Sequence, residues 1–144
     1  MTTLGRMLAM PVREQRLIAR VALHVIAFRI ALRIISSSRI RQLAARPALP
    51  SPSLGEFSPE HLGWAVRAVA RRVPGTTCLT QALTLHRLLI QAGHDAEIRI
   101  GVAKGDEGNL DSHAWVVCHG RILAGERGDL DRYATILSLG IERP

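Results

Sequence analysis

The sequence has few aromatic residues, few cysteines and almost no lysine, and each shortage narrows the possible functions. Aromatic residues make up 3% of the 144 residues, which argues against a repeated stacking platform for single-stranded nucleic acid. The two cysteines, Cys78 and Cys118, can form at most one disulfide. This argues against a small secreted protein stabilised by several disulfides and favours a location in the reducing cytoplasm. Lys104 is the only lysine, so the other 18 cations are arginines. This preference for arginine is explained more simply by codon bias than by function.

Long uncharged runs and several ligand motifs are also missing. The longest uncharged run in the apolar N-terminal stretch, residues 21–28, is far shorter than the roughly 20 residues that cross a bilayer. The sequence contains neither GxGxxG nor GxxxxGK[ST], and it has no CxxC pair and no HExxH spacing. We therefore expect no membrane span, no signal peptide, no cofactor and no metal.

The charge is divided unequally between the two halves. Residues 1–72 carry 12 arginines and three glutamates, a balance of +9, whereas residues 73–144 carry seven cations and nine acids, a balance of −2. A basic segment of this kind is either a solvated helix face or a surface that attracts nucleic acid, anionic lipid or an acidic peptide. Because no recognisable DNA-reading motif accompanies it, we expect no nucleic-acid partner.

The basic half predicts helices followed by a connector. Residues 11–46 are rich in Ala, Leu, Ile and Arg, but the arginine stripe breaks near residues 24–29 and three serines follow at 36–38, which predicts two helices or one kinked helix. Residues 47–57 hold three prolines, two serines and a glycine, which indicates an exposed connector. We divide the chain into a basic helical portion with its connector, 1–57, and a core, 58–144, within one compact domain.

The core begins with two predicted helices. Ser58 is an expected N-cap before Pro59, and apolar residues recur at helical spacing until Pro74-Gly75. Thr76 or Thr77 can cap the next helix, which is apolar enough to be central and ends near Gly93. Cys78 lies in the first turn of that central helix.

The pattern then changes to the alternation of strands. Residues 96–102 alternate as a half-buried strand, 104–111 form a polar loop, and 112–118 predict a second strand. His119-Gly120 is an expected tight turn, followed by a third strand from Arg121 to about Gly125. Helices followed by an antiparallel sheet predict an α+β fold, in which the central helix carrying the cysteine packs on a small sheet.

Cys78 and His113 are the residues best placed for catalysis. At a helix start, free N–H groups and the positive dipole end favour the thiolate and can also stabilise an oxyanion. On its strand, His113 shares a face with Trp115 and Val117 and can serve as the base that a cysteine nucleophile needs. We expect the other five histidines to be surface or packing residues.

The third catalytic residue depends on the register of the hairpin. If His119-Gly120 is a two-residue turn, Cys118 pairs with Arg121, and counting back places Glu126 opposite His113, where it would orient the imidazole. A bulge at Gly120 would place Gly125 there instead, leaving Glu126 or Asp111, two residues before His113, to compete for the role. We take Glu126 as the prediction and keep Asp111 as the alternative.

Several short segments between about residues 65 and 135 occur in a distinctive order and spacing. They are Arg71-Arg72-Val73-Pro74, Cys78-Leu79, Ala82-Leu83, Leu88-Leu89, Gly93, Ile100-Gly101-Val102, Ser112-His113-Ala114-Trp115-Val116 and Gly120-Arg121. Together they resemble the stand-alone lasso-peptide leader peptidases of the microcin-processing, transglutaminase-like cysteine protease family.

The resemblance implies a papain-like or transglutaminase-like peptidase that removes the leader from a ribosomally made precursor peptide. Cys78 would be the nucleophile and His113 the general base. The expected partners are a separate leader-binding recognition protein, which fused relatives carry as an N-terminal domain, and an ATP-dependent macrolactam synthetase. The N-terminal basic helices could contact either of these partners or a membrane surface.

The chain departs from the family at three positions. The usual aspartate lies at about Gly125, for which Glu126 is the substitute; Val117 stands at the acidic position after His-Ala-Trp-Val, and Gln81 stands at an often basic one. These departures keep two alternatives open: a non-catalytic scaffold that only positions the precursor, and a transglutaminase-like or amidase-like acyl transfer.

Overall fold

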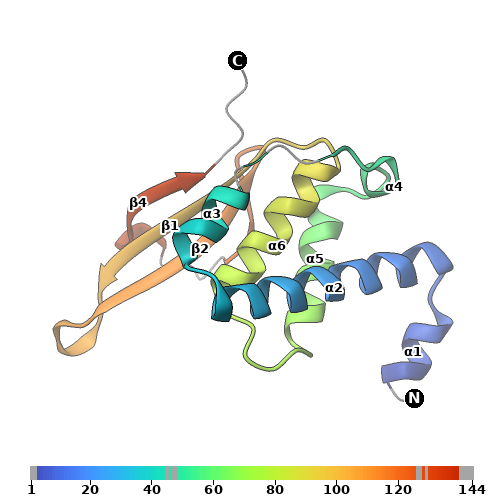
Figure 1. Cartoon of the computed structure of the whole chain (residues 1–144), viewed down its shortest axis with the longest axis horizontal. Coiled ribbons are helices and arrows are strands. Elements are labelled where there is room, and N and C mark those ends of the chain that lie inside the picture. Colours follow the sequence, from blue (N-terminus) through green and yellow to red (C-terminus); the bar gives the residue numbers. More distant parts are fainter. Residues whose placement is uncertain (1–2, 45, 47–48, 126–127, 129, 140–144) are drawn as a thin grey trace.

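The chain folds into stacked layers of helices on a sheet. In this computed structural model the described residues are 3–44, 46, 49–125, 128 and 130–139. The helices are α1 (Thr3–Ala9), α2 (Val12–Ile34), α3 (Ser37–Ala44), α4 (Pro52–Gly55), α5 (Pro59–Ala70) and α6 (Cys78–Gln91), with short 3-10 turns η1 (Asp106–Gly108) and η2 (Leu130–Arg132) (Figure 1). The strands are β1 (Ala96–Lys104), β2 (Leu110–Cys118), β3 (Arg121–Ala124) and β4 (Ala134–Leu139).

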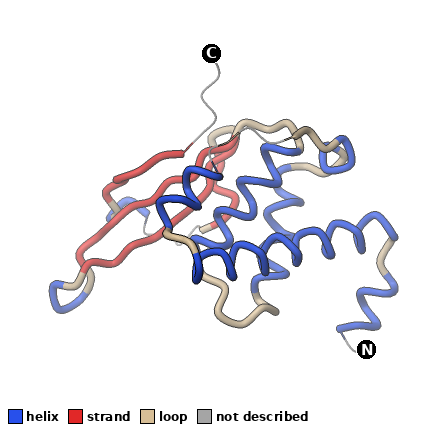
Figure 2. The backbone as a smooth tube through the Cα atoms, viewed as in Figure 1, coloured by secondary structure: helices blue, strands red, loops and turns tan. Residues whose placement is uncertain are grey.

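The strands form one antiparallel sheet in the order β3-β2-β1-β4. β1 and β2 make a long hairpin that extends beyond the helices and is closed by the η1 loop (Figure 2). The second hairpin turns at His119 and Gly120, whose φ angles of 50° and 77° are those of a two-residue turn with both central residues left-handed. The α+β fold and this turn are as the sequence predicts.

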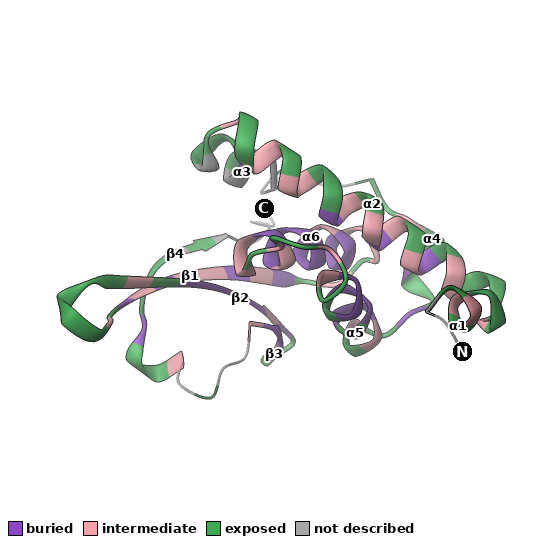
Figure 3. Cartoon of the chain, turned by 90° about the horizontal axis from the view of Figure 1, so that it is seen from below, coloured by how far each residue is buried: buried purple, intermediate pink, exposed green. Residues whose placement is uncertain are grey.

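The main core lies between α2 and the sheet. Figure 3 shows α2 over α5 and α6, with the buried positions concentrated in the layer beneath α2. α6 packs on β1 and β2, and α5 packs beside it against β3. Val21 and Val25 of α2 and Leu85 of α6 are fully buried in one cluster that also includes Ile98 and Val116 of the sheet. At about 25 cal/mol for each Å² of apolar surface removed from water, such burial is the main stabilising contribution to the fold.

The helical half differs from the prediction at two points. α2 runs unbroken to Ile34 and α3 begins at Ser37, so the predicted interruption at the serines is confirmed and the one near residues 24–29 is wrong. α2 continues past Arg29, which breaks the polar stripe, and the guanidinium of Arg29 lies against Gly75: a Cβ on Gly75 would lie 2.8 Å from Nη2. The described part of the predicted connector contains α4, and Leu54 and Phe57 there are buried.

One helix boundary and one strand also differ from the prediction. α5 ends at Ala70, short of Pro74, although its predicted cap is confirmed because Ser58 Oγ accepts a hydrogen bond from the N–H of His61 at 3.1 Å. β4 is an additional edge strand that pairs with β1. Among the described helices, none combines the length and the apolar character needed to cross a membrane.

Candidate active site

Cys78 is the first residue of α6, and Thr77 caps the helix. Thr77 Oγ1 accepts a hydrogen bond from the N–H of Thr80 at 3.2 Å, whereas Thr76 Oγ1 donates to the carbonyl of Val73. The partly buried Cys78 packs against the main core. In the part of the chain that the structure describes, the N–H groups of Cys78 and Leu79 make no backbone hydrogen bond, so they are available to an oxyanion near the thiol.

The other thiol, Cys118, is in a different environment. It is 2% exposed at the end of β2 and belongs to the main core. Burial raises the pKa of the Cys118 thiol, and the negative charges of Glu60 and Asp95 add to that effect. Because the thiolate is the reactive form, these features make Cys118 a poor candidate for the nucleophile.

His113 is buried on β2 and its tautomer is fixed by one hydrogen bond. Its Nε2 lies 2.6 Å from the backbone carbonyl oxygen of Gly125, and a carbonyl can only accept, so Nε2 carries the proton. A neutral imidazole protonated at Nε2 keeps its lone pair at Nδ1. Nδ1 is therefore the atom that could take a proton from a thiol.

Two aromatic rings, which also contact each other, pack against the imidazole. The His113 ring stacks with Trp115 at 6.1 Å between centroids and contacts Tyr133 at 5.7 Å. The hydroxyl of Tyr133 donates to Asp111 Oδ2 at 2.6 Å, and Arg132 Nη2 donates to the same oxygen at 2.9 Å. Asp111, the alternative third residue, thus fixes the tyrosine that packs on His113.

The hairpin register changes before it reaches His113. Cys118 pairs with Arg121 as predicted, but the register shifts between Val117 and Val116, so Leu123 is an extra residue in β3. Counting back along the ladder therefore no longer places Glu126 opposite His113, and Glu126 itself lies outside the described residues. The alternative register, with a bulge at Gly120, is not observed either, because Gly120 belongs to the two-residue turn and the shift falls three residues later, at Leu123.

Gly125 takes the position that the resemblance assigns to an aspartate. Its φ is +83°, and a Cβ there would lie 2.6 Å from the carbonyl oxygen of Ala114 and 2.8 Å from Trp115 Cβ. No L side chain fits this backbone without a shift. The group that accepts the hydrogen bond from His113 Nε2 and orients the imidazole is therefore the Gly125 carbonyl. The one signal in the sequence that could have indicated a backbone acceptor is this glycine itself, which stands in place of an acid.

The structure does not bring Cys78 and His113 into hydrogen-bond contact. Ala114 and Val116 face the main core under α6, whereas His113 and Trp115 point to the opposite face, where Trp115 clusters with Tyr133. Among the described residues no hydrogen bond joins the Cys78 thiol to either ring nitrogen of His113. The dyad stays a prediction, because in this structure the imidazole lies on the sheet face that points away from α6 and its cysteine.

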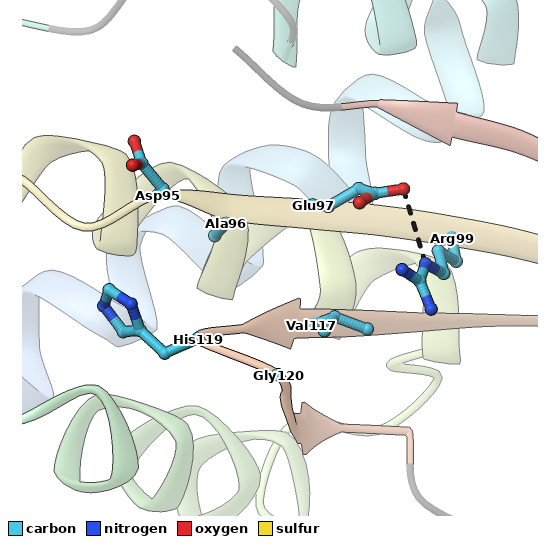
Figure 4. Close-up of a pocket in the computed structure, with 7 residues that line it drawn as sticks. All are labelled: Asp95, Ala96, Glu97, Arg99, Val117, His119 and Gly120. Carbon is cyan, nitrogen blue, oxygen red and sulfur yellow. Dashed lines mark hydrogen bonds and ion pairs between the residues drawn. The ribbon is translucent and has the colours of Figure 1, made fainter.

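One cleft at the other end of the sheet is separate from these residues. It has a volume of about 380 Å³ and is lined by Asp95, Ala96, Glu97, Arg99, Val117, His119 and Gly120, with an ion pair of 3.3 Å between Arg99 and Glu97 (Figure 4). Neither Cys78 nor His113 lines this cleft. Within the described residues no group of three His, Cys, Asp or Glu side chains is arranged to hold a metal ion.

The fold and these residues first define a class: an α+β protein whose central helix begins with a cysteine and whose antiparallel sheet carries a buried histidine. The family follows from comparison, because the family model of the transglutaminase-like superfamily matches residues 22–138. The chain therefore belongs to the transglutaminase-like superfamily, which comprises cysteine peptidases and acyl-transferring enzymes. The match begins inside α2, well before the segment that carried the resemblance. No curated protein and no solved structure shows a significant match to this chain.

Proposed function

We propose that this protein is a cysteine peptidase that removes the leader from a lasso-peptide precursor in the cytoplasm. The observation that carries the proposal is the position of Cys78, the first residue of a capped central helix in a chain of the transglutaminase-like superfamily. The peptidase subtype rests on the resemblance of residues 65–135 to the leader peptidases. The released core peptide would pass to a macrolactam synthetase, and a separate leader-binding protein would present the precursor.

The proposed reaction proceeds through a thioester. This reaction requires a conformation other than the one described above, in which the His113 imidazole lies beside Cys78. There the Cys78 thiol gives its proton to Nδ1 of His113, and Sγ attacks the carbonyl carbon of the cleaved peptide bond. The N–H groups of Cys78 and Leu79 stabilise the oxyanion of the tetrahedral intermediate. The intermediate expels the amine of the core peptide, which takes the proton from the imidazolium, and leaves the leader as a thioester on Cys78. A water molecule then gives a proton to His113 and attacks the thioester, which releases the leader carboxylate and restores the thiol.

The hydrogen bond from His113 to Gly125 supports this cycle. Because the Gly125 carbonyl accepts from Nε2, the imidazole is held in the tautomer whose Nδ1 can act as base. A neutral carbonyl stabilises the imidazolium less than a carboxylate would. We therefore expect a working but slower base than in relatives that carry an aspartate at this position.

The experiment is intact mass spectrometry of a precursor peptide incubated with the protein, with and without a leader-binding partner. Cleavage into leader and core should be abolished by Cys78→Ala and retained by Cys118→Ala, the matched control in which the other thiol is removed. Dependence of cleavage on the partner would show that the partner, and not the peptidase, recognises the leader. Wild-type cleavage by the Cys78→Ala protein would refute the nucleophile and the proposed mechanism.

A second candidate is a non-catalytic scaffold that positions the precursor for the synthetase. It is favoured by two observations: His113 faces away from α6, and Gly125 replaces the acid of the family. A thiol-directed electrophile separates the two candidates. The peptidase predicts selective labelling of Cys78 that His113→Ala slows, whereas the scaffold predicts labelling that His113→Ala leaves unchanged. A product that carries an added amine instead of water would indicate acyl transfer in place of hydrolysis.

A further inference from the structure

A second cleft lies on the helical side of the molecule, between α1, α2 and α5. Its volume is about 220 Å³, and its lining is mostly apolar. Met7 and Met10 line it from the N-terminal side, Ile18 from α2, and Trp64 from α5. Methionine side chains adapt to irregular partners, and Trp64 is 38% exposed at this surface. The cleft therefore offers a binding place for one large apolar side chain.

The rim of this cleft is positively charged. It is formed by Arg6, Arg71 and Arg72. Arg72 Nη1 donates to the carbonyl of Ala68 at 2.8 Å, which keeps this side chain along the end of α5. Arg6 and Arg71 are exposed, and in the described part of the chain no carboxylate pairs with either. An apolar floor with an unneutralised cationic rim selects a ligand that is apolar at one point and acidic around it.

The cleft also lies close to Cys78 along the chain. Arg72 is the second residue after the end of α5, and Cys78 comes six residues later. Six residues span at most about 22 Å, so one extended peptide of about seven residues can reach from the rim to the thiol.

We propose that this cleft binds an acidic segment of the peptide substrate and takes one large apolar side chain of that segment between Met10 and Trp64. The assignment to substrate rests on the proposed peptidase function. A second copy of the chain is disfavoured because its basic half would repel this rim, and a flat membrane surface does not fill a concave cleft.

Fluorescence polarisation with the full-length Cys78→Ala protein tests the site directly. The probe is a fluorescein-labelled heptapeptide, Asp-Glu-Asp-Leu-Glu-Asp-Glu. We expect binding that weakens at least tenfold when serine replaces leucine and that disappears when lysines replace the acids. The double variant Arg6→Glu/Arg71→Glu should also weaken binding at least tenfold. The matched control Arg33→Glu/Arg39→Glu changes the net charge equally outside the cleft and should change binding less than twofold.

Three results would overturn the site: no binding of the probe, equal binding of the serine peptide, or equal losses in both double variants. Sedimentation with phosphatidylglycerol vesicles that only Arg6→Glu/Arg71→Glu abolishes, without peptide binding, would reassign the surface to lipid. For the substrate, Arg6→Glu/Arg71→Glu should raise KM for the precursor about tenfold and leave kcat unchanged, and an unchanged KM would overturn that part. A protein that binds the probe but cleaves no precursor would overturn the peptidase and leave the binding site standing.

Discussion

Protonation of His86 is expected to destabilise the fold at mildly acidic pH. His86 lies in α6, is fully buried, and donates from Nε2 to the carbonyl of Ala96 at 3.2 Å. Its Nδ1 is buried without a hydrogen-bond partner among the described residues. A second proton would place a charge in the core with no acceptor for the added N–H. Burial is the main reason that the pKa of His86 falls to about 4, and the charge of Arg87 adds to it.

The sign and size of the effect follow from this value. In the unfolded chain the pKa of a histidine is about 6.5, so between pH 6.5 and 4 the unfolded chain binds the proton more readily than the folded protein. The contribution to stability is complete above about pH 6.5, falls as the pH is lowered, and levels off below about pH 4. At about 1.4 kcal/mol for each pH unit between the two values, His86 protonation removes about 3 kcal/mol of unfolding free energy.

Urea unfolding at pH 7 and pH 4 measures this loss. The variant His86→Leu lacks the titrating group. Between pH 7 and pH 4 the unfolding free energy of the wild type should therefore fall by about 3 kcal/mol more than that of the variant. Carboxylates titrate in both proteins and cancel in the comparison. His119→Asn is the control, because His119 is an exposed turn residue and asparagine tolerates its φ of 50°. An equal pH dependence in wild type and His86→Leu would refute the reasoning.

Three further predictions concern the sheet and the thiols. Iodoacetamide at pH 8 should alkylate Cys78 at least tenfold faster than Cys118, as followed by peptide mass spectrometry, because burial raises the pKa of Cys118; equal rates would contradict this. Gly125→Ala should lower the unfolding free energy by about 3 kcal/mol and Gly108→Ala by only about 1 kcal/mol in urea titrations, since both have positive φ but only Gly125 lacks room for a Cβ. Tyr133→Phe should cost about 1 kcal/mol through the lost hydrogen bond to a carboxylate, and an unchanged urea midpoint would argue against that bond.

Local chemistry explains what the sequence could predict. The starts of α5 and α6 follow from capping hydroxyls at Ser58 and Thr77, which act on N–H groups three residues away. The alternation along β2 likewise separated His113 from the residues that face the main core. These features depend on residues close together in the sequence, and for that reason they can be predicted from a single sequence.

Features that depend on residues far apart in the sequence were harder to predict. The bulge at Leu123 sets the acceptor of His113, and it is fixed by how β3 packs on β2 and α5 rather than by its own residues. The place of the Arg29 guanidinium depends on the space left by Gly75, far away in the chain. β4 has exposed residues at Ala134 and Ile136, and it exists because β1 offers an edge for pairing.

The burial of α2 affects how the chain can be shortened. Leu17, Val21 and Val25 fill the space over α5 and α6, and the family match begins inside this helix at residue 22. The change in composition near residue 57 is therefore a boundary of charge and not of folding. A protein trimmed to the segment that begins at Ser58 would leave the outer faces of α5 and α6 bare to water. Fusion tags and truncations should spare everything from Pro11 onward, because this basic helix belongs to the same folding unit as the cysteine helix beneath it.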